Sequence, residues 1–176
     1  MTRDGKLIPL LILFPKMTIS TAFAMKHLKR RDCEKILIDC NCIDFLLTNE
    51  KDFLEKKNEY HYFVSSSVVE EIATIPDGKK NKRIALFLAL CKIGASFLND
   101  SCFVLGKARL GFSNLGEGKV YSEILNESQN NTRDSIIADT AVTNDCVLLT
   151  NDSKFCKKMK RLGYAALSFE EFISET

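Results

Sequence analysis

The chain has 176 residues, of which 45% are hydrophobic and 27% are charged, and its formal net charge is +2. This length allows one domain with a sizeable hydrophobic core, and the composition excludes an intrinsically disordered chain. A net charge this small does not by itself indicate a nucleic-acid partner.

The first 33 residues are predicted to be an N-terminal extension or the product of a mis-assigned start, because Met17 and Met25 both precede the first good strand. The apolar run at 7–14 contains Pro9 and is far shorter than the roughly 20 residues of a membrane span. It also resembles the hydrophobic part of a secretion signal, an alternative that stays open.

The cysteines favour a cytoplasmic protein. There are seven, an odd number, and they form no C-x-x-C pair. This pattern predicts free thiols in a reducing compartment rather than a disulfide framework or a zinc site. We therefore expect a cytoplasmic chain that does not have a membrane among its partners.

Short apolar runs alternate with helical patterns along the rest of the chain. Strands are predicted at residues 35–39, 60–65, 146–150 and 164–169. Helices are predicted at residues 42–57 with a break near Thr48 and Asn49, 67–75, 79–98, 116–128, within 130–145, 153–163 and 170–175. The stretch 102–112 reads as a strand followed by a turn, but its pattern is ambiguous.

The strongest strands are continuous apolar runs, which is typical of a parallel sheet covered on both faces. We predict the α/β class: a single three-layer domain over residues 34–176, with a mainly parallel central sheet flanked by helices.

The helix at 67–75 has a start signal in its sequence. Ser67 and Glu70 have the spacing of a capping box, in which two side chains satisfy backbone N–H groups at a helix start. This interpretation assigns Glu70 to capping and leaves Glu71 as the freer carboxylate.

Acidic side chains collect where the predicted strands end. Asp39 ends the first strand, and Asp152 lies two residues past the strand at 146–150. Glu71 lies early in the helix after the second strand, and Asp134 begins the helix before the third. Ligand sites of open parallel sheets form outside the carboxyl ends of the strands. Carboxylates that meet there repel one another, and Mg²⁺ or Mn²⁺, which prefer oxygen ligands, would remove that repulsion.

Each carboxylate also has a purely structural explanation. Asp152 could cap the helix at 153–163, and Asp134 could add favourable charge to a helix N-terminus. Asp39 is harder to explain in this way, because it follows three apolar residues. Taken together, the separate explanations account for the pattern less well than one shared site.

Four segments then occur in the order of a known family. They are "ILIDCNCIDFL" (36–46), "FVSSSVVEEI" (63–72), "RDSIIADTAV" (133–142) and "VLLTNDSKF" (147–155). In these residues the chain resembles the PIN domain, a metal-dependent ribonuclease fold that includes the VapC-like toxins. The resemblance implies that the catalytic and metal-binding residues are Asp39, Glu71, Asp134 and Asp152. It implies that the supporting residues are Asn41, Thr150, Asn151 and Asp139.

The activity that this resemblance implies is endoribonuclease hydrolysis of RNA phosphodiester bonds by a water that Mg²⁺ or Mn²⁺ activates. Lys154, Lys157 and Lys158 are candidate RNA contacts, as is the basic run at 79–83, although a solvated helix face explains them equally well. The chain would be a toxin of a toxin–antitoxin pair or an RNA-processing nuclease. Its expected partners are an RNA substrate, an antitoxin protein and a second copy in a homodimer.

Two other functions stay open. One is a non-catalytic PIN-like binding module in an RNA-associated complex. The other is a phosphatase or receiver-like domain, which would need a Lys at another strand end that we cannot place. Cys40 and Cys42 lie beside the predicted site but lack a partner base, because His61 lies at the wrong end of its strand.

Overall fold

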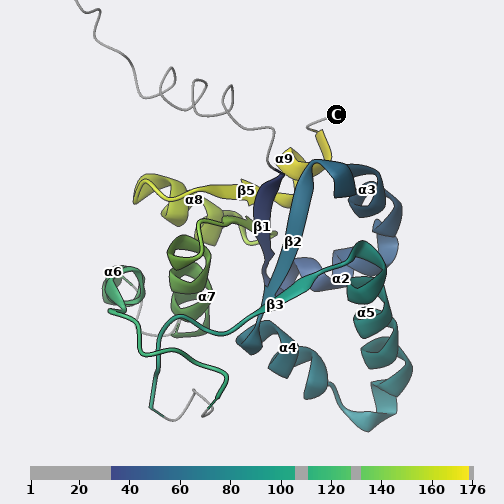
Figure 1. The fold of residues 1–176 in the computed structure, drawn as a ribbon, viewed down its shortest axis with the longest axis horizontal. Coiled ribbons are helices and arrows are strands. Elements are labelled where there is room, and N and C mark those ends of the chain that lie inside the picture. Colours follow the sequence, from purple (N-terminus) through teal and green to yellow (C-terminus); the bar gives the residue numbers. More distant parts are fainter. Residues whose placement is uncertain (1–32, 106–110, 128–131, 175–176) are drawn as a thin grey trace, which may run out of the picture. The chain divides into compact units, whose positions relative to one another are not determined.

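The centre of the fold is a five-stranded sheet in which every neighbouring pair of strands is parallel. The computed structural model describes residues 33–105, 111–127 and 132–174 (Figure 1). The strand order is β3-β2-β1-β4-β5. The strands are β1 (Glu34–Ile38), β2 (Tyr60–Ser65), β3 (Ser96–Leu98), β4 (Val147–Thr150) and β5 (Ala166–Ser168). The sheet confirms the predicted α/β class.

Helices cover both faces of this sheet. The helices are α2 (Cys40–Thr48), α3 (Glu50–Glu55), α4 (Ser66–Ala73), α5 (Lys80–Ile93), α6 (Lys119–Glu127), α7 (Thr132–Thr143), α8 (Ser153–Arg161) and α9 (Phe169–Ser174), with short 3-10 turns η1 (Lys56–Asn58) and η2 (Asp77–Lys79). In Figure 1, α2, α3 and α5 lie on one side of the sheet, and α6, α7 and α8 on the other. None of the described helices is long and apolar enough to cross a bilayer.

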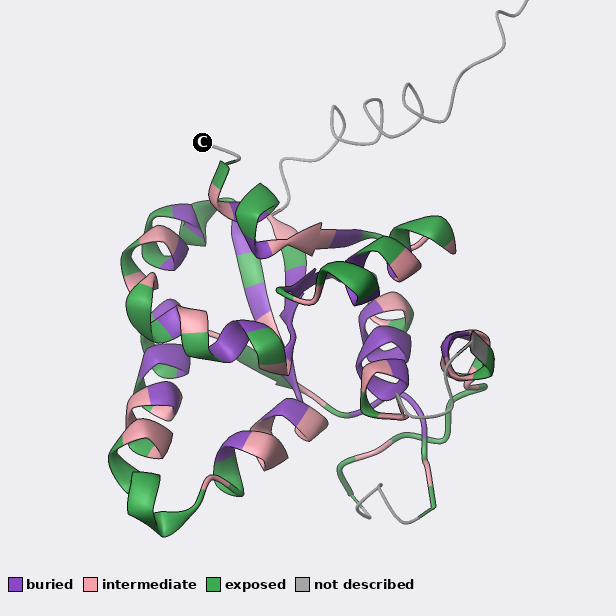
Figure 2. Cartoon of the chain, turned by 180° about the vertical axis from the view of Figure 1, so that it is seen from behind, coloured by how far each residue is buried: buried purple, intermediate pink, exposed green. Residues whose placement is uncertain are grey.

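The two central strands form the core of the domain. Ile36, Leu37 and Ile38 in β1 and Leu148 and Leu149 in β4 are fully buried. Continuous apolar runs of this kind are expected where a parallel sheet is covered on both faces. Figure 2 shows the same burial along most of α7, in which every residue from 135 to 141 is buried. The apolar runs that predicted the central strands are therefore the residues that the fold buries.

The long helix predicted at 79–98 is wrong, because the chain forms a strand before its end. Helix α5 stops at Ile93, and Gly94 takes a left-handed conformation with φ of 73°. The Ala95 N–H then donates a hydrogen bond to the Leu90 carbonyl at 3.0 Å, as at the ends of many helices that are followed by glycine. The next three residues form β3, which pairs with β2 at the sheet edge. The predicted helix missed this break because the apolar pattern continues through it.

The other elements differ from prediction mainly in their bounds. The predicted break near Asn49 separates α2 from α3. Residues 102–105 form no strand, and 106–110 lie outside the described part. All seven cysteines are free, as expected. The predicted extension lies outside the described residues except for Cys33.

An aromatic cluster holds the last helix on the domain. Phe172 of α9 is fully buried, and its ring lies 4.9 Å from that of Phe53 and 5.7 Å from that of Tyr60. Lys56 is also buried, and its ammonium donates to the Phe172 carbonyl at 2.7 Å. Helix α9 is thus part of the core rather than a loose tail.

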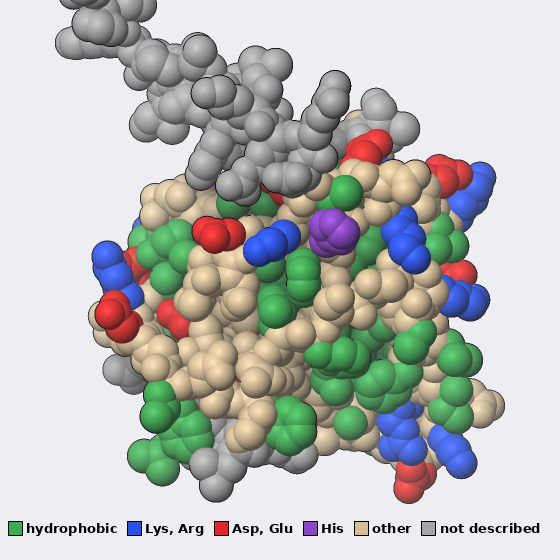
Figure 3. All heavy atoms as spheres, viewed as in Figure 1, with side chains coloured by type: hydrophobic (Ala, Val, Ile, Leu, Met, Phe, Trp, Pro, Cys, Tyr) green, Lys and Arg blue, Asp and Glu red, His purple; other side chains and the backbone are tan. Residues whose placement is uncertain are grey.

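Some large apolar side chains remain at the surface. Hydrophobic groups gather in several places on the face shown in Figure 3. Among the described residues, the exposed large side chains of α5 and β3 are Ile84, Leu88 and Phe97. Phe97 is 64% exposed, although its strand belongs to the sheet, because β3 is an edge strand.

The buried and exposed phenylalanines give a matched stability test. Phe172→Ala should lower the free energy of unfolding by about 3–5 kcal/mol, because it leaves a cavity among four aromatic rings. Phe97→Ala should change it by less than about 0.5 kcal/mol, because that ring is mostly in solvent. Urea denaturation of both variants measures the difference. Equal losses in the two variants would contradict the burial of α9.

Candidate functional site

Asp39 directly follows β1 and is almost completely buried, with 1% of the residue exposed. Its N–H donates to the Leu149 carbonyl at 2.9 Å, so its backbone continues the pairing of β1 with β4. Its carboxylate accepts hydrogen bonds from the Thr150 hydroxyl at 2.7 Å and the Asn41 amide at 3.2 Å. Burial raises the pKa of Asp39, and these hydrogen bonds oppose that rise without cancelling it.

Asp152 lies beside Asp39 because β4 is the neighbour of β1. Its N–H donates to the Thr150 hydroxyl at 3.1 Å, the same hydroxyl that donates to the Asp39 carboxylate. The Asp152 carboxylate accepts from the N–H groups of Lys154 at 2.8 Å and Phe155 at 3.0 Å. Asp152 is therefore the N-cap of α8, the structural role that its sequence context allowed.

Asp134 lies in the first turn of α7 and is half-buried. The pKa of its carboxyl is raised to about 6, first by burial and then by the negative charges of Asp39 and Asp152. Lys158 and Arg133 pull the same pKa down. Asp39, Asp134 and Asp152 come from three separate segments, and the first and last of them act electrostatically on Asp134.

Glu71, on α4, borders the same group of carboxylates. Its negative charge contributes to the raised pKa of Asp39, and its carboxylate accepts a hydrogen bond from the Cys40 thiol. It also forms an ion pair with Arg133, with 2.6 Å between Oε2 and Nη1. Both side chains are about half exposed, so this pair adds little to stability. Its position beside the carboxylates is the more informative feature.

The capping box predicted at Ser67 and Glu70 is wrong. Helix α4 begins one residue earlier, with Ser65 as its N-cap, and the Ser65 hydroxyl accepts from the Val68 N–H at 3.4 Å. The Ser67 N–H and hydroxyl instead donate to Asp100, at 3.2 and 2.8 Å. Three consecutive serines made the start ambiguous in the sequence. Glu70 lies near Asp100, since its charge raises the pKa of that carboxyl.

The loop at 99–102 links the helices that carry Glu71 and Asp134. Asp100 binds the start of α4, as described, while Ser101 binds α7. The Ser101 N–H donates to the Thr140 hydroxyl at 3.1 Å, and its own hydroxyl donates to the Asp139 carboxylate. Asp139 also accepts from the Tyr121 N–H at 3.1 Å. Asp139 is thus placed with this loop and α6, and its predicted supporting role in the site stays a prediction.

The remaining predicted site residues differ in how exposed they are and in their contacts. The Asn151 side chain is exposed, and its backbone forms a hydrogen bond with the Cys42 thiol. Lys154 and Lys157 are exposed on α8. Lys158 is partly buried, and its ammonium donates to the Ile124 carbonyl at 2.6 Å. Among the basic run at 79–83, Lys82 pairs with Asp44, so that part of the run is committed to ion pairs within the chain.

The sequence did not identify Arg133 and Asp100 as residues that contact or support the candidate site. Arg133 is adjacent to Asp134, and a cation next to a predicted acidic ligand was a signal that could have been used. Asp100 gave no signal, because its partner Ser67 is 33 residues away in the sequence.

The donor set consists of carboxylate oxygens, the ligands that hard divalent cations prefer. Asp39, Asp134, Asp152 and Glu71 are the residues that could hold such an ion. Burial raises the pKa of Asp134 first, and the negative charges of Asp39 and Asp152 raise it further, a repulsion that a bound cation would relieve. Over the described ranges, no three carboxylate, thiol or imidazole groups form a ready-made metal-binding group.

Comparison with solved structures agrees with this fold. PAE2754 from Pyrobaculum aerophilum is 13% identical, with a TM-score of 0.53 over 80% of this chain and 93% of that one. VapBC2 from Rickettsia felis, bound to a DNA fragment from their promoter, is 15% identical, with a TM-score of 0.52 over 76% and 98%. VapBC-1 from nontypeable Haemophilus influenzae is 16% identical, with a TM-score of 0.51 over 77% and 98%.

At these identities the likeness concerns the fold alone. The described residues have a PIN-like fold, which confirms the fold predicted from the sequence. No family model matches the sequence, and no curated protein matches it significantly.

The raised pKa of Asp134 predicts a pH-dependent stability. Its carboxyl holds a proton up to about pH 6 in the folded chain, but only to about 3.8 in the unfolded chain. Stability should therefore fall as the pH rises through this interval, because the unfolded chain releases its proton first. With a chelator present, Asp134→Asn should melt above the wild type at pH values above about 6. The advantage should vanish near pH 3.8. An equal shift at both pH values would contradict the raised pKa of Asp134.

Two substitutions separate the helix-capping role of the Asp152 side chain from the effect of its negative charge. Asp152→Asn keeps an oxygen that accepts from the two N–H groups, so the free energy of unfolding in chelator should stay equal or rise. Asp152→Ala removes the cap and should cost about 1 kcal/mol. Urea denaturation measures both variants. A loss in the Asn variant as large as that in the Ala variant would show that the charge itself is needed for the fold.

Proposed function

We propose that the chain is a metal-dependent endoribonuclease that hydrolyses RNA phosphodiester bonds. The observation that supports this most is the electrostatic convergence of Asp39, Asp134 and Asp152 at the carboxyl ends of β1 and β4. A binding module has no evident need for neighbouring acidic groups, buried or half-buried, whose repulsion costs stability. A nuclease needs them, because they attract the cation that handles phosphate.

The proposed ligands of Mg²⁺ or Mn²⁺ are Asp39, Glu71, Asp134 and Asp152. When bound, the metal would lower the pKa of a water and offset the charge of the phosphate. The Thr150 hydroxyl and the Asn41 amide hold the Asp39 carboxylate in one orientation. The helix N–H groups hold that of Asp152 in the same way. These contacts preorganise two of the four proposed ligands.

Arg133 would bind the RNA phosphate beside the metal. Its guanidinium already lies at a carboxylate of the site, 2.6 Å from Glu71. If Glu71 turns to a cation, the guanidinium becomes available for a phosphate oxygen, to which Arg can donate two hydrogen bonds. Lys154, Lys157 and Lys158 of α8 would extend this basic surface along the RNA, giving affinity without sequence choice.

The likeness to two VapBC structures supports including a toxin of a toxin–antitoxin pair among the biological roles. An antitoxin protein would then be a partner, with RNA as the substrate, and the site of action would be the cytoplasm. An RNA-processing nuclease is the other form of the same proposal, and a second copy of the chain in a homodimer is a further proposed partner. The non-catalytic PIN-like module in an RNA-associated complex remains the alternative. The cleavage assay below decides between the nuclease and this module.

Cleavage of single-stranded RNA by the purified full chain, with Mn²⁺, with Mg²⁺ and with a chelator, tests the proposal. Glu71→Gln should lower the rate about 100-fold or more, the scale of losing one preorganised charge contact. Glu70→Gln is the matched control on the same helix and should keep the rate within a few-fold, because Glu70 lies towards Asp100. The reverse pattern would refute the proposed ligand set. A folded wild type without metal-dependent cleavage would favour the non-catalytic module.

A further inference from the structure

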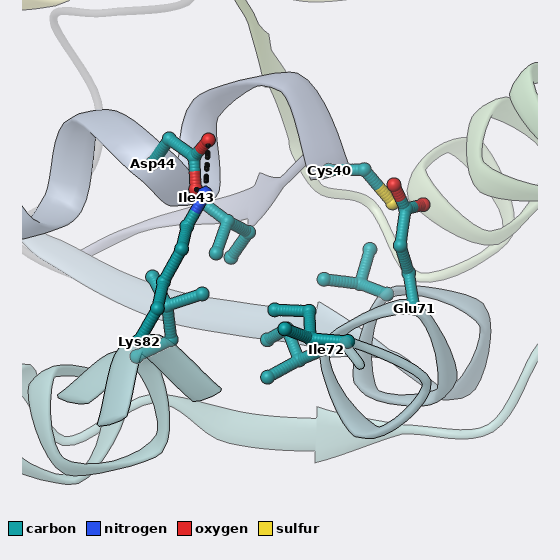
Figure 4. A pocket seen from close by; sticks show the side chains of 9 residues that line it. Cys40, Ile43, Asp44, Glu71, Ile72 and Lys82 are labelled. Carbon is teal, nitrogen blue, oxygen red and sulfur yellow. Dashed lines mark hydrogen bonds and ion pairs between the residues drawn. The ribbon is translucent and has the colours of Figure 1, made fainter. Parts of the chain in front are cut away.

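A hollow of about 140 Å³ opens beside the carboxylates, between α2, α4 and α5. Figure 4 shows Cys40 and Glu71 at one end of it and Asp44 and Lys82 at the other. The rest of the lining consists of the aliphatic side chains of Ile43, Val68, Ile72, Ile75 and Leu86. We propose that this hollow, lined by these nine residues, binds the guanine base of the nucleotide next to the cleaved phosphate.

The aliphatic walls suit the faces of a flat ring. Ile43, Val68, Ile72 and Leu86 are each at most 3% exposed, so they are held in place by the core behind them. Ligand sites combine apolar walls with a few polar groups that set the orientation of the ligand. A base placed between rigid aliphatic side chains loses contact with water on both faces, which is favourable for the ring.

The end of the hollow with Asp44 and Lys82 supplies the hydrogen-bonding pattern that selects the base. The Lys82 ammonium lies 2.7 Å from Asp44 Oδ1 and 2.8 Å from Oδ2. A carboxylate beside an ammonium offers two adjacent acceptors next to a donor. The Watson–Crick edge of guanine carries the complementary set, two adjacent N–H donors beside a carbonyl oxygen. Adenine has a single amino donor on that edge and cannot satisfy both carboxylate oxygens.

The ion pair can give way to a base at little cost. The Lys82 side chain is 40% exposed and that of Asp44 is 63% exposed. Pairs this exposed contribute little to stability. A base that entered the hollow would replace one exposed contact by hydrogen bonds to the same two charges.

The hollow is also correctly placed for a substrate nucleotide. Glu71 belongs both to the lining of the hollow and to the group of carboxylates. A base bound there is therefore part of a nucleotide whose phosphate lies at the carboxylates. This assignment of the ligand rests on the proposed function, but binding to the hollow requires no catalysis and can be measured separately.

Methyl NMR of the full chain, in chelator, measures that binding directly. Guanosine 5′-monophosphate should shift the methyl signals of Ile43 and Ile72, and adenosine 5′-monophosphate should bind about tenfold more weakly, the scale of one bidentate contact. Inosine 5′-monophosphate, which lacks the second N–H donor, should also bind more weakly than the guanosine nucleotide. Asp44→Asn should weaken binding of the guanosine nucleotide about tenfold and reduce the preference over adenosine.

Glu50→Gln is the matched control, because Glu50 forms a similar exposed pair with Lys92, at 3.0 Å, outside the lining of the hollow. It should leave the nucleotide preference unchanged. Equal binding of both nucleotides, an unchanged preference in Asp44→Asn, or methyl shifts caused by a short leucine-rich peptide but not by the guanosine nucleotide would each overturn the proposal.

Cleavage of RNA strands that contain a single guanosine separates the two proposals. A wild type that cuts beside guanosine about tenfold faster than elsewhere supports the hollow as the base site. Metal-dependent cleavage without base preference overturns the hollow and leaves the nuclease intact. Guanosine-selective binding without any cleavage supports the hollow and counts against the nuclease.

Discussion

The parallel pairing of β1 with β4 is the constraint on which the candidate site depends. Ile38 is in register with Leu149, and the Asp39 N–H continues the same ladder to the Leu149 carbonyl. The Thr150 hydroxyl can therefore reach the Asp39 carboxylate and the Asp152 N–H together. A slip of one residue would turn these side chains to opposite faces of the sheet. The register itself is set by the buried aliphatic residues of both strands, so the packing of the core places the carboxylates.

The four carboxylates are stabilised by different neighbours, and this explains how a folded chain tolerates them. Hydrogen bonds from Thr150 and Asn41 satisfy Asp39, helix N–H groups satisfy Asp152, and Arg133 pairs with Glu71. The raised pKa of Asp134 reflects its burial and the remaining repulsion from Asp39 and Asp152. The same group of side chains is thus a structural junction between four helices, α2, α4, α7 and α8, and the two strands β1 and β4, and a region of concentrated negative charge.

The loop at 99–102 adds a second junction. Asp100 holds the start of α4, and Ser101 holds the middle of α7. Because α4 carries Glu71 and α7 carries Asp134, these contacts of the loop help to fix the two helices relative to each other. Asp139, which resembles an additional acidic site residue in the sequence, is used in this junction.

The sequence by itself determined the strands with continuous apolar runs, the α/β class and the placement of acidic residues after strands, because these depend on local pattern and burial. It did not determine β3, which a glycine in a left-handed conformation separates from α5, or the choice of Ser65 as the cap of α4. Only the tertiary structure decided the partners of the site. The pairs Arg133–Glu71, Ser67–Asp100 and Thr150–Asp39 are separated by 62, 33 and 111 residues in the sequence. Such contacts depend on how packed elements orient their side chains, and no local pattern carries that information.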